Sequence, residues 1–533
     1  MNNFNQDNGG MQKRMLIMTL VVFVFFIAYE FLVLKPQQEA KQAQAQTQTT
    51  QNSAPAVEQG TNVSASAENM SKSVNALSSK AIGSNEIITQ VKTKHNIIEI
   101  DNLGRIAQVT LQDKQYIDGN HEQIKLFEAN QLRPLEVRFA DVNVNNEAFK
   151  VNLIADKSNV DATSSTQKVV LTQNLTDTVL TKEFTFYPDG HYDLKISSTN
   201  DKKFFITNGF RPNVLADMYA DHGMYVKLND GTMELVEDGD LSKTNNYTGI
   251  KFVSNFDRYY ATVIYNFQQS LAVTVMPDSQ NNPQAFIHGN DNITFSGYLG
   301  PKEFNTLKAL NPELTDVIEY GWFTFIAKPM FVLLQYIHNM VGNWGWTIVI
   351  VTILIKLVLY PLSYKGMVSM QKLKDLAPKI KEIQEKYKDD KQKASMHMME
   401  LYKKNGANPM GGCLPILLQI PVFFAIYRVL LNAIELKGAE WIFWIHDLAE
   451  MDPYFVLPIL MGVSMWLQQK ITPNTMQDEM QKKIFQMLPI VFTFFFLWFP
   501  AGLTLYWFVN NVFTIAQQYT INKMFEKKRA IKK

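Results

Sequence analysis

The chain has 533 residues, of which 46% are hydrophobic and 19% are charged, and its formal net charge is +1. These averages hide a division, because residues 35–318 carry 25 basic and 33 acidic side chains whereas residues 319–533 carry 24 and 15. The apolar runs lie almost entirely before and after the acidic region, which indicates a membrane protein with a large polar insert and excludes an ordinary globular enzyme. A single cysteine, Cys413, excludes an intrachain disulfide framework and a Cys-based zinc site.

Three catalytic and nucleotide-binding patterns are missing from the sequence: GxxxxGK, HExxH and GxSxG. We therefore expect no enzyme, no catalytic residues, no metal and no cofactor.

The first apolar run, residues 15–34, follows a short polar segment, residues 1–14. The run has 20 residues, which is enough to cross a membrane and longer than the roughly 7–15-residue core of a signal peptide. We interpret it as an uncleaved signal anchor, with a removed signal peptide as the alternative. Residues 35–85 are rich in Gln, Ala, Ser and Thr, which predicts a flexible linker.

Residues 86–315 contain many short runs in which apolar and polar residues alternate, separated by turn residues such as PDG at 188–190 and NDG at 229–231. This pattern predicts an all-β sandwich, which is large enough to bury its own core. The aromatic residues of these strands are compatible with a site for a small ligand or with a purely structural role.

Residues 320–341 are apolar but interrupted by Lys328 and Pro329. We expect an amphipathic helix lying on the outer membrane face, because a further crossing here would place a very basic loop outside. Five more spans are predicted, which makes six with the signal anchor: 345–364, 413–434, 454–469, 484–499 and 501–519.

The loops between these spans alternate in charge. Loop 365–411 has 11 lysines and six acids, and loop 470–483 has three lysines and two acids. Loop 435–453, in contrast, has one lysine and five acids, and the tail 520–533 has six basic residues and one acid. Basic loops stay on the cytoplasmic side, so we expect both termini to be cytoplasmic and residues 35–318 and 435–453 to face outward.

Loop 365–411 has apolar residues at three- and four-residue steps on both sides of a turn at 388–391, which predicts a cytoplasmic helical hairpin. Its lysines suit a solvated surface near anionic lipid, or a docking site for a hydrophobic client or ribosomal RNA. Met370 and Met399 are candidates for client contact, with core filling as the alternative.

One charged residue, Lys356, lies inside the apolar run 345–364, where a cation costs about 2.5–3.5 kcal/mol. Thr352 and Tyr360 lie four residues before and after it, on the same helix face. The alternatives are a hydrated pocket or a side chain that reaches the headgroups, about 12 Å away along the helix. Other spans carry polar groups at similar depth that pair between helices or line the same pocket: Gln419, Tyr506, Asn510, Asn511 and Thr514.

Three segments, 408–430, 444–470 and 495–511, closely resemble the YidC/Oxa family of membrane protein insertases, and the layout resembles its Gram-negative YidC type. The resemblance implies a five-helix core with a hydrophilic groove that is open to the cytoplasm and to lipid. It also implies a cation in the groove, which is Arg in many relatives and corresponds to Lys356 here.

The same resemblance assigns groove-lining or client-contacting positions to Thr352, Gln419 and Tyr506, and Trp507 lies where the family has an aromatic residue. It implies insertion of nascent membrane proteins into the inner membrane of a Gram-negative bacterium, alone or with the Sec translocon. The implied partners also include inner membrane lipids and a ribosome contacted by the hairpin and the basic tail. A secondary transporter and a membrane-anchored periplasmic chaperone remain as alternatives.

Overall fold

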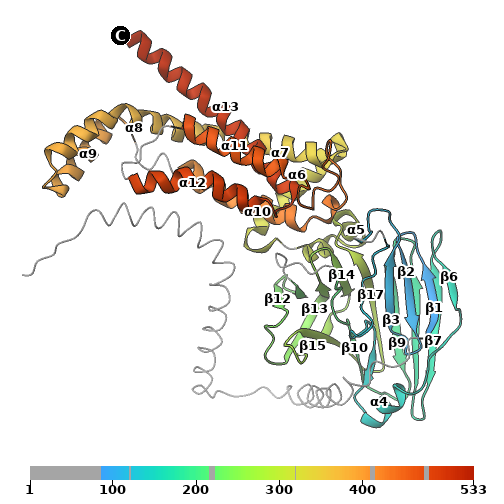
Figure 1. Ribbon diagram of the computed structural model, residues 1–533. Helices are drawn as coiled ribbons and strands as arrows, with labels where there is room; N and C mark the ends of the chain where they lie inside the picture. Colours follow the sequence, from blue (N-terminus) through green and yellow to red (C-terminus); the bar gives the residue numbers. More distant parts are fainter. Residues whose placement is uncertain are drawn as a thin grey trace, which may run out of the picture.

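The computed structural model describes residues 86–118, 122–214, 222–318, 320–407, 414–472 and 479–532. These residues form an all-β part and a set of long helices, with the sheets at one end of the helices (Figure 1). The predicted combination of a large all-β domain with a helical part is therefore confirmed. The predictions for the N-terminus, the signal anchor and the linker, residues 1–85, concern residues outside the described ranges.

The β part contains two sheets. The smaller sheet has four strands in the spatial order β3 (Ile106–Leu111), β2 (Asn96–Asp101), β1 (Ile87–Lys92) and β6 (Asn159–Asp161). The larger sheet has 13 strands, and its main path runs β4 (Val137–Phe139), β10 (Phe204–Thr207), β16 (Pro283–Gly289), β15 (Leu271–Pro277), β13 (Asn245–Phe256), β14 (Tyr260–Tyr265), β17 (Asn292–Pro301), β9 (Tyr192–Ser198), β8 (Val179–Phe186), β7 (Gln167–Asn174) and β5 (Ile154–Ala155). Off this path, β11 (Gly223–Leu228) pairs with β13 and with β12 (Met233–Glu237). A short helix, α4 (Val142–Ala148), follows β4.

The side-chain pattern of the strands explains where the core lies. Along β8, Leu180, Phe184 and Phe186 are buried and alternate with more exposed residues, as expected for a strand with one face against the core. Every residue of β14 is buried, so this central strand is covered on both faces.

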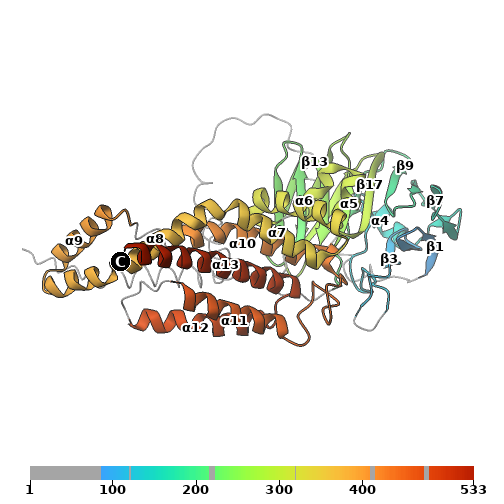
Figure 2. The ribbon, with the colours of Figure 1, turned by 90° about the horizontal axis from the view of Figure 1, so that it is seen from above.

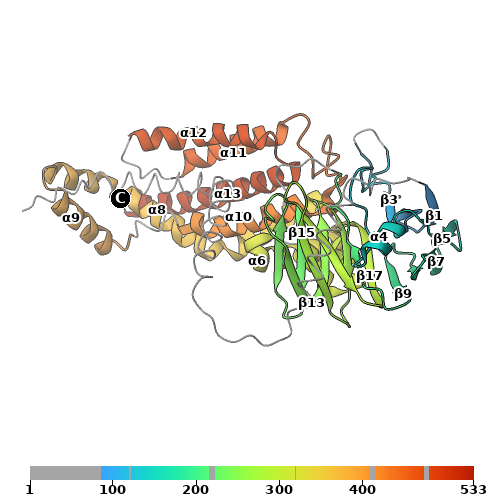
Figure 3. The same cartoon turned by 90° about the horizontal axis from the view of Figure 1, so that it is seen from below.

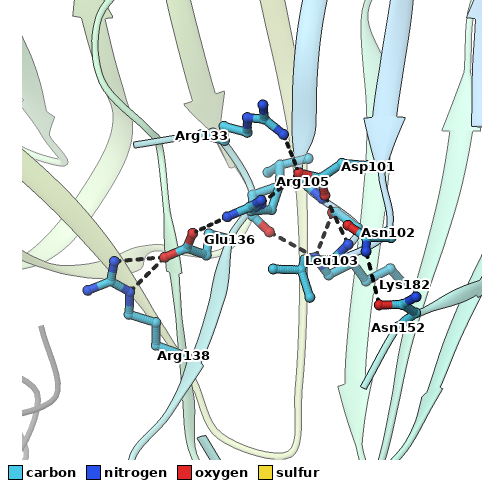
Figure 4. Close-up of polar contacts among 11 residues, drawn as sticks. Asp101, Asn102, Leu103, Arg105, Arg133, Glu136, Arg138, Asn152 and Lys182 are labelled. Carbon is cyan, nitrogen blue, oxygen red and sulfur yellow. Dashed lines mark hydrogen bonds and ion pairs between the residues drawn. The ribbon is translucent and has the colours of Figure 1, made fainter. Parts of the chain in front are cut away.

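A network of buried charges joins the two sheets (Figure 4). Asp101, at the end of β2, accepts hydrogen bonds from Arg105 (2.8 Å) and Arg133 (2.7 Å). Arg105 also donates to Glu136 (3.0 Å), which is paired with Arg138 (2.7 Å) next to the large sheet. Removal of one partner from such a network leaves an uncompensated buried charge, which typically costs about 3–5 kcal/mol.

Lys182 lies beside this network but forms no ion pair with it. Its ammonium group donates to the backbone carbonyls of Gly104 (2.7 Å) and Leu135 (2.8 Å). Burial lowers the pKa of Lys182 to about 7. The two carbonyls therefore tie β8 to the loops that carry the charged network.

The helical part follows the last strand. Its elements are α5 (Phe304–Leu310), η1 (Pro312–Val317), η2 (Gly321–Phe323), α6 (Thr324–Val341), α7 (Trp344–Val358), α8 (Tyr360–Lys386), α9 (Lys391–Lys404), α10 (Leu414–Asn432), η4 (Ile434–Leu436), α11 (Val456–Ile471), α12 (Glu479–Phe496) and α13 (Ala501–Lys532). Figures 2 and 3 show α8 and α9 extending away from the sheets. Helix α8 contacts the C-terminal part of α13, where Arg529 pairs with Asp375. Helix α6 has two faces, because Phe325 and Met340 are exposed whereas Phe331 and Leu334 are buried.

The structure differs from the prediction of one straight helix over 345–364. The run contains two helices, α7 and α8, which meet at Leu359 with a bend of 64°. Pro361 explains the break, because inside a continuous helix it could not donate to the carbonyl of Leu357 and its ring would clash with that carbonyl, whereas the first turn of a new helix tolerates proline. Among the described helices, none alone combines the length and the mean hydropathy of a span, whereas this bent pair does.

Helices α8 and α9 form the hairpin. Leu373, Leu376 and Ile380 of α8 are buried against partly buried residues of α9, among them Met398 and Leu401. Asp390 caps α9 by accepting a hydrogen bond from the backbone N–H of Lys393 (3.0 Å).

The β part and the helices share a continuous apolar core. At their junction, Arg258 donates to the carbonyl of Leu431 (2.8 Å), and the rings of Phe304 and Phe331 lie 5.2 Å apart. The backbone N–H of Phe304 donates to a carboxylate oxygen of Glu435 (3.0 Å). Helix α5 therefore connects the sheets to α6 and α10.

Candidate functional site

A narrow groove lies between α7, α8, α10 and α13. Most of its lining is apolar, but one face carries a cation and several polar groups. The lining residues are Ile355, Lys356, Leu359, Leu362, Ser363, Gln419, Val422, Tyr506 and Asn510.

Among the described residues that line this groove, Lys356 alone is charged, and 8% of it is exposed. Its ammonium group donates to the hydroxyl of Thr514 (3.0 Å) and to the amide oxygen of Gln419 (3.4 Å). Both acceptors are neutral, and among the described residues no carboxylate forms an ion pair with Lys356. A buried cation is costly without a counter-charge, so the groove keeps an uncompensated positive charge close to a hydrogen-bonding surface.

The polar groups around Lys356 form a chain of hydrogen bonds across three helices. The amide nitrogen of Gln419, on α10, donates to the side-chain oxygen of Asn510 on α13 (2.8 Å). The hydroxyl of Thr514 donates to the backbone carbonyl of Asn510 (2.7 Å). Gln419 therefore accepts from the cation through one end and donates through the other, which holds α7, α10 and α13 together at the groove.

Helix α13 supplies one wall because Tyr506, Asn510 and Thr514 follow each other at four-residue steps and so share a face. Tyr506 and Asn510 are 3% and 5% exposed, respectively. The sequence prediction named Tyr506 and Asn510 as groove residues, and the structure brings both together with Lys356 and Gln419.

Three other predicted groove residues lie elsewhere. The hydroxyl of Thr352 donates to the carbonyl of Ile348 in its own helix (2.6 Å) and does not line the groove. Tyr360 lies just beyond the bend, where it is 37% exposed and packs beside Tyr364 with ring centroids 5.9 Å apart. The bend at Leu359 removes it from the face of Lys356.

The third of these residues, Trp507, belongs to an aromatic cluster outside the groove. Its ring lies 4.5 Å from that of Phe423, 5.8 Å from that of Phe492 and 5.5 Å from that of Phe496. These contacts pack α13 against α10 and α12.

Thr514 was predicted to pair between helices or to line the pocket, and its hydroxyl accepts a hydrogen bond from Lys356. Ser363 was not among the predicted groove residues. Ser363 lines the groove because α8 turns at Leu359, which the apolar run did not reveal.

The two hairpin methionines lie away from this groove. Met399 is 59% exposed and borders a shallow depression on α9 together with Met396 and Lys403. Met370 is partly buried on α8.

A helical part with an internal groove and an uncompensated cation, joined to a large all-β domain, defines the class of this protein as a helical membrane protein with a β-sandwich domain. Two family models match the chain in this arrangement. The model described as YidC periplasmic domain matches residues 89–333, and the model described as 60Kd inner membrane protein matches residues 336–528.

Curated relatives match along almost the whole chain. The membrane protein insertase YidC of Campylobacter jejuni is 49% identical over 98% of both chains. The YidC of Wolinella succinogenes is 50% identical over 99% of this chain and 98% of its own, and that of Helicobacter pylori strain 26695 is 44% identical over 98% of both. The chain belongs to the YidC family of inner membrane protein insertases.

Proposed function

We propose that this protein inserts nascent membrane proteins into the inner membrane through the groove at Lys356. The observation that carries the proposal is the setting of this side chain, which is buried and, within the described residues, bonded only to the neutral acceptors Gln419 and Thr514. A cation in this state attracts acidic or polar chain, and the neutral groups beside it replace part of the water that such chain would lose.

The groove lowers the barrier for insertion because it offers a polar path for the short segment that must cross the membrane. The adjoining apolar segment of the client leaves between the helices into lipid. Exposed apolar side chains on α7, such as Leu357 and Val358, support this route, because they give the helix a face suited to lipid or to a hydrophobic segment.

The orientation of the chain is part of the proposal. Six spans place residues 1–14, 365–411, 470–483 and 520–533 in the cytoplasm, and the β domain and loop 435–453 in the periplasm of a Gram-negative cell. The alternation of basic and acidic loops supports it.

In this orientation the protein has different partners on the two sides of the membrane. On the cytoplasmic side, the hairpin and the basic tail contact a ribosome and receive clients, with Met370 and Met399 as client contacts. The periplasmic domain contacts the Sec translocon when the protein does not act alone, and α6 and the spans contact inner membrane lipids.

The full chain in lipid vesicles tests the proposal. We expect it to insert a single-span client with an acidic translocated segment, measured as protection of that segment from added protease. Lys356→Ala reduces the protected fraction, whereas the matched variant Lys437→Ala, in the acidic loop, leaves it unchanged. Equal protection in vesicles with the wild-type chain and with Lys356→Ala would show that the groove charge does not act in insertion.

A further inference from the structure

The groove face of α13 continues beyond Thr514 to another buried polar residue, Gln517. Seven residues separate it from Asn510, so the two side chains leave the helix axis only about 20° apart. Gln517 thus lies about two turns beyond Asn510 along α13, toward the C-terminal tail. It is on the side of the helix that carries Tyr506 and Asn510.

Gln517 is 7% exposed, yet within the described part of the chain neither its amide nitrogen nor its amide oxygen has a hydrogen-bond partner. An unpaired buried polar group typically costs about 1–3 kcal/mol. The half-buried amide of Gln419, in contrast, uses both ends of its side chain, to Lys356 and to Asn510.

The neighbouring residue, Gln518, is buried like Gln517 but has a hydrogen-bond partner. Gln518 is also buried, with 3% exposed, and its amide nitrogen donates to the side-chain oxygen of Asn522 (2.8 Å). The fold therefore satisfies one glutamine and leaves the adjacent one, which is turned toward the groove side of the helix, unsatisfied. A stability cost at a position next to a binding site is typical of a functional residue.

A side-chain amide matches one partner particularly well. It presents one acceptor and one donor side by side, as a peptide group does, so a peptide group can bond to both at once. A client segment that crosses in an extended form carries unpaired N–H and C=O groups, which need partners wherever water is excluded.

We propose that Gln517 binds the main chain of the translocating client segment through both ends of its amide, independently of the client's side chains. This inference rests on the proposed function of the groove. Lys356 then attracts charge in the client, whereas Gln517 holds backbone beyond the groove lining, further along α13 toward the C-terminal tail.

The test uses the full chain in vesicles and a single-span client whose translocated segment is polar but has no acidic residue. Gln517→Leu, which keeps the size of the side chain and removes the amide, slows insertion about two- to tenfold, the equivalent of one net hydrogen bond. Its melting temperature is equal to that of the wild type or higher, because no hydrogen bond within the protein is lost. The matched variant Gln518→Leu does the reverse: its melting temperature falls and its insertion rate stays the same.

A second measurement reports contact directly. In a Cys413→Ser background, Gln517→Cys forms disulfides with cysteines placed along the translocated segment of the client, and Gln518→Cys does not. Gln517→Met serves as a second apolar replacement in case leucine packs poorly.

Insertion at the wild-type rate by Gln517→Leu and Gln517→Met overturns the inference. Slower insertion that comes with a lower melting temperature in both variants also overturns it, since it assigns Gln517 a structural role. Lys356→Ala with an acidic client runs in parallel. If that variant is impaired and the Gln517 variants are not, only this inference fails; if neither is impaired, the proposed function of the groove fails as well.

Discussion

At the scale of single residues, the charge of Lys356 is held by two neutral groups, Gln419 and Thr514, and this determines how it responds to substitution. Arginine keeps the charge and adds donors, while its planar head group demands a wider set of acceptors. A carboxylate reverses the charge and makes no use of the amide and hydroxyl oxygens as acceptors.

We predict that Lys356→Arg retains insertion and that Lys356→Ala and Lys356→Glu impair it for clients with acidic translocated segments. The loss with Lys356→Glu is the largest, because like charges in a low-dielectric groove repel. Complementation in cells depleted of the wild-type protein measures the effect, with a client that has a neutral segment as control. Normal insertion of the acidic client by Lys356→Glu would contradict an electrostatic role.

At the scale of elements, the hairpin of α8 and α9 is held by a thin apolar seam. Met398 is part of that seam, whereas its neighbour Met399 is 59% exposed and borders the depression on α9. Met398 and Met399 have the same side chain in different surroundings. Substitution of each one therefore distinguishes an effect on hairpin packing from an effect on client contact.

We predict that Met399→Ser weakens early client capture without lowering the thermal stability of the protein. Met398→Ser instead destabilises the hairpin, because a polar group replaces a side chain of the seam. Capture is measured by crosslinking of ribosome-bound client to the hairpin, and stability by thermal unfolding. If the client crosslinks to the hairpin of Met399→Ser as well as to that of the wild type, Met399 has no role in client capture.

At the scale of the whole molecule, the junction between the β domain and the helices contains one unusual carboxyl group. Desolvation raises the pKa of Glu435, in loop 435–453, to about 7, with a smaller contribution from the nearby carboxylate of Glu303. The group is therefore protonated in the folded protein at pH values where it is ionised in the unfolded chain.

The sign of the pH dependence follows from this difference. Because the folded state binds the proton more tightly, the free energy of unfolding falls as the pH rises from about 4.5 to about 7 and levels off above. Glu435→Gln still accepts the hydrogen bond from Phe304 and flattens this slope, measured by melting temperatures of the full chain in detergent between pH 5 and 8. Glu440→Gln, in the same loop but exposed, is the control and leaves the slope unchanged; an unchanged slope with Glu435→Gln would refute the assignment.

A deletion tests whether insertion by the helical part requires the β domain. Every described residue that lines the groove lies within 355–363, 419–422 or 506–510, so we expect removal of residues 60–300 to leave the groove intact. We predict that the shortened protein inserts a single-span client near the normal rate but melts at a lower temperature, since the carbonyl of Leu431 loses its bond from Arg258. Loss of insertion by a stably present deletion protein would assign the β domain a direct role.

The sequence was informative where a local pattern decides the structure. Alternation along β8 revealed a strand with one buried face, and the periodic apolar residues of 365–411 revealed the hairpin. It was less informative at Leu359, where a long apolar run concealed the effect of Pro361 and the helix was expected to continue.

Prediction of the groove residues from the sequence was limited in the same way. Helical spacing placed Thr352 and Tyr360 on the face of Lys356, but spacing cannot report that a hydroxyl bonds to its own helix or that the helix bends. The pairing of Gln419 with Asn510 depends on how α10 and α13 pack, and neither helix encodes that register alone. The resemblance to a known family supplied what the spacing did not.

The bend at Leu359 makes α8 a lever with its pivot at the groove. The helix has 27 residues and so is about 40 Å long, and its far end carries the hairpin turn. A swing of about 10° about Leu359 moves that tip by about 7 Å but shifts Ser363, about 6 Å from the pivot, by only about 1 Å. A rotation of this size would therefore displace the hairpin turn by several ångströms while the groove residues next to Leu359 keep nearly the same positions.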